Sequence, residues 1–144
     1  KMSGELLSVM TFTVPRFGGD SEWEIGRYTV GDVRVIGGAQ KIWRAFVNEY
    51  SPKSVKTFAD RRFGDGSVYG RLGFTRGADT GISHWYVDKN GERTYHRMTF
   101  QKWKLEKLLK TFDPALTEAV NMKNNGWKRV WDCGHASWKW SEET

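Results

Sequence analysis

The sequence has a single cysteine, Cys133, among its 144 residues, which excludes an internal disulfide. A lone thiol fits a reducing compartment, and we expect a cytoplasmic protein. No apolar run approaches the roughly 20 residues that a membrane helix needs. The first residues also lack a basic region followed by an apolar one, so we expect neither a signal peptide nor a membrane partner.

The sequence also lacks the residue clusters of a metal site. Cys133 and His135 are two positions apart, but a zinc site needs four ligands with better spacing. No carboxylate pair with a nearby Glu-x-Lys and no His-Asn-His cluster is present, so nothing indicates a nuclease centre. We therefore predict no metal.

What is present is typical of a globular protein, with 38% hydrophobic and 28% charged residues. The length predicts one domain over residues 1–144 with one core. The net charge of +6 favours a polyanionic partner, which could be nucleic acid, the phosphates of coenzyme A (CoA), or both.

Periodicity predicts a mixed α/β fold. A turn at Ser3-Gly4 implies a partner strand upstream, so we expect the chain to begin inside a larger fold. Asn90-Gly91 predicts a hairpin between residues 84–87 and 93–100. The predicted strands are residues 5–14, 23–30, 55–59 and a terminal pair, 129–133 with 136–140; the predicted helices are residues 39–50, 67–72, 101–111 and 117–123.

A glycine pair lies where a strand is predicted to end and a helix to begin. Free backbone amides and the positive end of the helix dipole would face one point there, and such a point binds phosphate. An ordinary glycine-rich turn is the alternative interpretation. The candidate phosphate-binding residues are Arg34, Ile36, Gly37, Gly38, Ala39, Gln40 and Lys41.

A second motif follows at Tyr69, where a short predicted helix ends at Gly73-Phe74. The two motifs together resemble those of the GNAT acyltransferase superfamily. Arg34, Gly37 and Ala39 match its pyrophosphate loop, Arg/Gln-x-x-Gly-x-Gly/Ala, and the second motif matches its Tyr-x-x-x-Gly-Phe helix. The resemblance covers about residues 5–97. It implies a mostly antiparallel sheet splayed at the pyrophosphate loop, with helices on both faces.

The same resemblance implies acetyl-CoA or another acyl-CoA as cofactor and Tyr69 as general acid towards the departing thiolate. The alternative for Tyr69 is a core residue packing on the sheet. Asp60, at a predicted strand end, is a candidate general base. Its alternative is an ion pair or turn cap beside Arg61 and Arg62.

Two narrower resemblances point towards DNA. Asp60 followed nine residues later by Tyr69 is similar to the Mom-type DNA modification proteins of phages. A wider series, including residues 59–62, 69–74 and 130–134, resembles a phage domain that often follows a nuclease in homing-endonuclease-like proteins.

Residues 91–110 combine six Lys or Arg with interleaved aromatic residues, a pattern that suits a nucleic-acid surface. The alternative is a solvated basic helix whose aromatic side chains lie in the core, and we expect Trp103 in the core. The candidate nucleic-acid-binding residues are Arg61, Arg62, Arg93, His96, Arg97, Lys102 and Lys104.

The leading hypothesis is a phage-type GNAT-like protein that transfers an acyl-type group from CoA to a base amine of DNA. One alternative is a non-catalytic DNA-binding module that positions a nuclease domain or partner chain. Another is an ordinary N-acetyltransferase for a small amine or a protein.

Overall fold

The computed structural model describes residues 4, 6–16, 18–33 and 35–142. The chain forms two compact units. Unit 1 consists of Lys1–Thr80 and Gly134–Thr144, and unit 2 consists of Gly81–Cys133. Each unit has a hydrophobic cluster of its own, whereas length alone led us to expect one core. Ser3, which belongs to a predicted turn, lies outside the described residues, and so does the predicted phosphate ligand Arg34.

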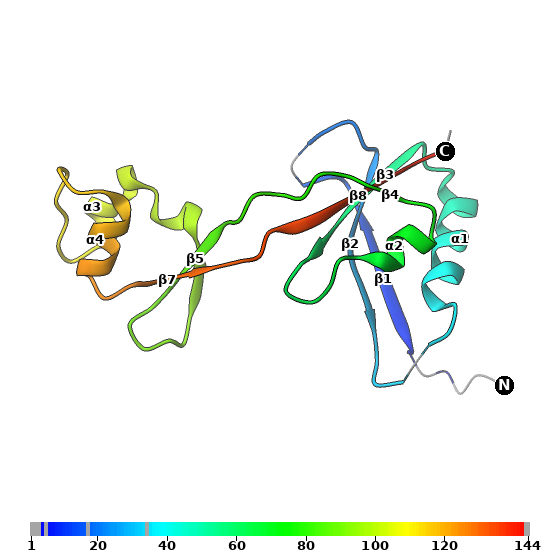
Figure 1. The fold of residues 1–144 in the computed structure, drawn as a ribbon, viewed down its shortest axis with the longest axis horizontal. Coiled ribbons are helices and arrows are strands. Elements are labelled where there is room, and N and C mark those ends of the chain that lie inside the picture. Colours follow the sequence, from blue (N-terminus) through cyan, green and yellow to red (C-terminus); the bar gives the residue numbers. More distant parts are fainter. Residues whose placement is uncertain (1–3, 5, 17, 34, 143–144) are drawn as a thin grey trace. The chain divides into compact units, whose positions relative to one another are not determined.

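Unit 1 is built on a mixed five-stranded sheet in the order β1-β2-β3-β8-β4 (Figure 1). Only β2 and β3 are parallel; every other neighbouring pair is antiparallel. The strands are β1 (Ser8–Thr13), β2 (Trp23–Val30), β3 (Ser54–Asp60), β4 (Thr75–Arg76) and β8 (His135–Ser141).

Two helices, α1 (Gly38–Tyr50) and α2 (Ser67–Arg71), cover this sheet. The predicted apolar stripe of α1 is confirmed, because Trp43 and Phe46 are buried in the core. Trp43 packs edge-on against Trp140 of β8, with ring centroids 5.2 Å apart, and α2 lies against Trp138 two residues earlier. Side chains two residues apart on a strand share a face. Both helices therefore pack on the same face, which corrects the prediction of helices on both faces.

The physical reason is the alternation of side chains along the strands of the sheet. On β8, Ala136, Trp138 and Trp140 pair with the apolar or buried positions of β3 and face the helices. Ser137 and Lys139 alternate with them and point to the other face. Only one face of β8 is therefore apolar enough to receive a helix.

Unit 2 is a three-stranded sheet in the order β6-β5-β7 with short helices. The predicted hairpin is confirmed: β5 (His84–Val87) pairs with β6 (Thr94–His96) across a turn in which the amide of Gly91 donates to the Asp88 carbonyl. Its second strand is shorter than the predicted 93–100, because residues 97–100 form a 3₁₀ helix. Tyr86, Phe100, Leu105 and Met122 form the core. The other elements are the 3₁₀ helices η1 (Arg97–Phe100) and η2 (Lys102–Lys104), helices α3 (Leu105–Leu108) and α4 (Glu118–Asn124), and strand β7 (Lys128–Trp131).

Three local predictions are wrong. The last two strands do not pair with each other, because β7 pairs with β5 whereas β8 pairs with β3 and β4. The expected helix over residues 101–111 is shorter and broken into η2 and α3. Val33, Val35 and Ile36 lie in the connection between β2 and α1 rather than in a strand.

Candidate functional site

The parallel strands β2 and β3 are paired only over their first halves. The ladder joins Trp23–Ile25 to residues 55–57, although β2 continues to Val30 and β3 to Asp60. The hydroxyl of Thr57 donates to the Ile25 carbonyl at 3.0 Å, close to where the pairing stops. Towards their carboxyl ends the two strands are no longer joined, and in open α/β sheets ligands bind beyond such ends.

An extra residue in β2 explains why the pairing stops. The register with β1 passes from Phe12 opposite Ile25 to Thr11 opposite Arg27, so that Gly26 has no opposite residue. Such a β-bulge bends its strand and increases the local twist. A Cβ at Gly26 would lie 3.2 Å from the Thr11 hydroxyl, so glycine suits this position. The bulge therefore directs the second half of β2 away from β3.

The amino end of α1 follows β2 and the connecting loop. Gly37 caps the helix with a left-handed backbone, φ 72°, and no side chain caps the first turn. Its carbonyl accepts the first helical hydrogen bond from the amide of Lys41, at 3.0 Å. Of the predicted phosphate ligands, Gly38 and Ala39 are buried, whereas Ile36, Gly37, Gln40 and Lys41 are exposed. The predicted helix start is confirmed, and Arg34 lies outside the described residues.

Two hydroxyl groups beside this first turn were not singled out from the sequence. A Cβ built on Gly38 would lie 3.2 Å from Ser8 Oγ, 3.5 Å from the Tyr28 hydroxyl and 2.7 Å from a Val35 methyl group. Ser8 and Tyr28 come from β1 and β2, so only strand pairing brings them to the helix. Gly38 allows this close approach.

Tyr69 lies on α2 and is only 6% exposed. Its ring packs against Phe74, with ring centroids 5.8 Å apart, and belongs to the core of unit 1. The structure thus gives Tyr69 a packing role, and its role as an acid stays a prediction.

Asp60 ends β3 and is bound by Arg62. The guanidinium Nε of Arg62 donates to both carboxylate oxygens, at 3.1 and 3.0 Å, and the Arg62 amide donates to Oδ1 at 3.0 Å. The hydrogen bonds from Arg62 lower the pKa of Asp60 to about 2. Efficient general bases have pKa values near the working pH, so this carboxylate is a weak proton acceptor at neutral pH. Arg61 is also paired, to Asp79 at 3.2 Å.

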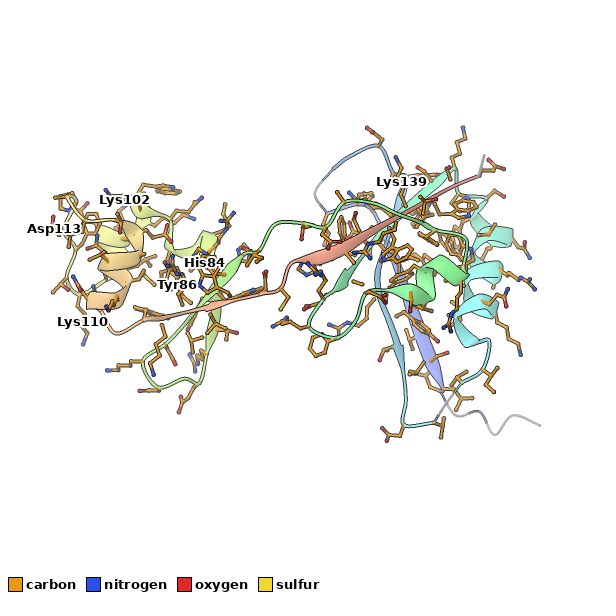
Figure 2. All side chains as sticks on the ribbon, in the orientation of Figure 1. His84, Tyr86, Lys102, Lys110, Asp113 and Lys139 are labelled. Carbon is orange, nitrogen blue, oxygen red and sulfur yellow. The ribbon has the colours of Figure 1, made fainter. Side chains whose placement is uncertain are left out.

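The remaining predicted nucleic-acid ligands, Arg93, His96, Arg97, Lys102 and Lys104, all belong to unit 2 (Lys102 is labelled in Figure 2). His96 stacks edge-on against Trp85, with ring centroids 5.0 Å apart. The ammonium of Lys104 donates to the Met98 carbonyl at 3.1 Å and lies 4.7 Å from the centre of the Trp103 ring.

Trp103 is 75% exposed, so the prediction that it lies in the core is wrong. The reason is the 3₁₀ geometry of η2, which differs from the predicted α-helix and changes which residues share a face. Phe100 takes the core position instead.

No protein-family model matches this chain, and no curated protein matches it significantly. Its fold and surface are therefore the basis for any functional proposal. Within the described residues, no three His, Cys, Asp or Glu side chains are grouped so that they could hold a metal ion. The described helices are also too short or too polar to cross a bilayer.

Proposed function

We propose that this protein is a GNAT-like acyltransferase that binds an acyl-CoA in unit 1 and acts on DNA. One observation carries the proposal: the only parallel pair of the main sheet, β2 and β3, is connected by α1 and stops pairing at the Gly26 bulge. The sheet order β1-β2-β3-β8-β4, with the last strand inserted beside β3, supports the same proposal. A mostly antiparallel sheet whose parallel pair separates ahead of the glycine loop is what the GNAT resemblance implies.

The pyrophosphate of the cofactor would lie at the amino end of α1. The amides of Gly38, Ala39 and Gln40 precede the first helical hydrogen bond, and the helix dipole makes this end positive. The ammonium of Lys41 adds a charge, and the hydroxyls of Ser8 and Tyr28 add two donors.

The pantetheine arm would lie between the unpaired halves of β2 and β3. Its amide groups can bond to backbone groups that a neighbouring strand would otherwise satisfy. Bound acyl-CoA would supply an acyl thioester for transfer to an amine, and Tyr69 would serve as the proton donor for the CoA sulfur. We assign no base role to Asp60, because its pKa of about 2 makes it too weak.

The DNA part of the proposal rests on the charge of unit 2. Residues 81–133 contain ten Lys and Arg against six Asp and Glu, so unit 2 has +4 of the total +6. Basic side chains with an exposed indole such as Trp103 suit a polyanion that carries aromatic bases.

Calorimetric titration with CoA tests the cofactor site. We expect Lys41→Glu to weaken CoA binding at least about tenfold, because it places a carboxylate where the pyrophosphate would lie. Lys53→Glu is the matched control, since Lys53 is exposed and follows the opposite end of α1. If wild-type protein does not bind CoA, the acyltransferase part is refuted.

A non-catalytic DNA-binding module is the second candidate, favoured by the burial of Tyr69 and the ion pair of Asp60. It predicts steeply salt-dependent DNA binding together with no CoA binding. Measurement of both ligands on one preparation distinguishes the two candidates.

A further inference from the structure

A cavity of about 400 Å³ lies in unit 2 between α4 and β7. Its volume is within the range of small-ligand sites. None of the predicted site residues lines it. Three cationic residues, Lys123 of α4 with Lys128 and Arg129 of β7, line one part. Ala119, Val120 and Trp127 give it an apolar part.

The cations of this cavity lack carboxylate partners within the described part of the chain. No ion pair there involves Lys123, Lys128 or Arg129. Unit 1 differs, because Arg16 is paired with Glu24 and Arg76 with Asp79. Three exposed charges around one cavity repel one another, and an anionic ligand would relieve that repulsion.

One residue that lines the cavity, Tyr86, already binds the carboxylate of Glu118. Tyr86, which is 1% exposed, donates its hydroxyl proton to Oε1 of Glu118 at 3.0 Å. Burial raises the pKa of Tyr86 to about 12, so the phenol keeps its proton and the hydrogen bond persists at neutral pH. Figure 2 labels Tyr86 beside His84, whose Nε2 lies 4.0 Å from the same carboxylate oxygen.

An exposed indole extends the surface along β7. Trp131 is 54% exposed, and the guanidinium of Arg129 lies 4.7 Å from the centre of its ring. A ligand with one phosphate in the cavity could therefore place a further base on Trp131. Indole faces stack on unpaired bases, whereas the bases of a duplex are already stacked on one another.

We propose that this cavity is a nucleotide-binding site for single-stranded nucleic acid. A backbone phosphate lies among Lys123, Lys128 and Arg129, and its base lies against Val120 and Trp127. The inference deepens the DNA part of the proposed function and rests on it: the polynucleotide is bound where it is unpaired.

The test is fluorescence anisotropy with labelled oligo(dT) and a duplex of equal length, over a series of salt concentrations. Each phosphate contact to a single strand contributes about 0.7 to the slope of log K against log salt, or roughly fivefold in affinity near 0.1 M salt. We expect Lys128→Ala to lower affinity by that factor and the slope by about 0.7. Lys53→Ala, at an exposed lysine of unit 1 outside the proposed nucleic-acid surface, is the matched control and should change neither property beyond a general charge effect.

A second variant tests the apolar part of the cavity. Val120→Glu places a carboxylate where the proposed base would lie, and Val120 is 40% exposed, so unit 2 should still fold. We expect a loss of more than tenfold in oligo(dT) affinity. Leu108→Glu, at an exposed apolar position of α3, is its control.

The possible outcomes separate this inference from the proposed function. Oligo(dT) binding that is unchanged by Lys128→Ala and Val120→Glu refutes the cavity but leaves DNA binding by unit 2 in place. Tighter binding of the duplex than of oligo(dT) refutes the single-strand inference. A mononucleotide that competes as strongly as unlabelled oligo(dT) also refutes the single-strand inference, in favour of a small nucleotide ligand. CoA binding by unit 1 is independent of all three outcomes.

Discussion

Replacement of Gly66 by alanine tests how unit 1 holds α2, and with it Tyr69. Gly66 is the N-cap of α2 and has a left-handed backbone, φ 78°. An added Cβ would lie 2.6 Å from Nε1 of Trp138 and 2.7 Å from the Cβ of Ala59. Neither neighbour can move freely, because Trp138 donates to the Asp65 carbonyl at 3.0 Å and Ala59 belongs to β3.

The expected cost combines two contributions. A left-handed backbone costs a residue with a Cβ about 1 kcal/mol. Insertion of a methyl group into a packed core adds about 2 kcal/mol. We therefore expect Gly66→Ala to lower the free energy of unfolding of unit 1 by about 3 kcal/mol.

A matched control isolates the packing contribution. Gly37 is the N-cap of α1 with φ 72°, and among the described, non-adjacent residues no atom lies within 4 Å of an added Cβ there. Gly37→Ala should therefore cost only about 1 kcal/mol. Urea denaturation measures both variants, and hydrogen exchange of the β3 and β8 amides assigns the transition to unit 1. Equal costs for the two variants would refute the packing argument.

Three further predictions concern polar groups. Asn121→Ala should destabilise unit 2 by about 2 kcal/mol in urea denaturation. The buried side-chain amide of Asn121 donates to the backbone carbonyl of Asp113 and accepts from the backbone amide of Asp113, both at 2.9 Å. A loss below about 0.5 kcal/mol would contradict this prediction. Asp60 has a lowered pKa, so its ionised form contributes about 1 kcal/mol, after solvent screening, to the free energy of unfolding of unit 1. That contribution is present above pH 3.8 and is lost as the pH falls towards about 2. Acid denaturation of Asp60→Asn should lack this step. Burial, and after it the positive charge of Arg129, lower the pKa of His84. Unit 2 should therefore lose stability as the pH falls below 6.5, because the folded state resists protonation of His84. His84→Gln should weaken this pH dependence when it is measured by thermal unfolding.

Local patterns predicted many elements because their causes lie within a few residues. Asn90-Gly91 predicted the hairpin of unit 2, and the spacing of Trp43 and Phe46 predicted the buried face of α1. The wrong pairing of the last two strands has a long-range cause. The partners of β7 and β8 depend on residues far away in sequence, and so does the division into two cores.

The candidate sites divide in the same way. The glycines at the start of α1 and the excess of basic residues between positions 91 and 110 could be recognised without the structure, because each feature depends only on neighbouring residues. The early end of the pairing between β2 and β3 and the cavity between α4 and β7 became visible only in the folded structure. Strand register and packing create these arrangements, and both depend on contacts between residues distant along the chain.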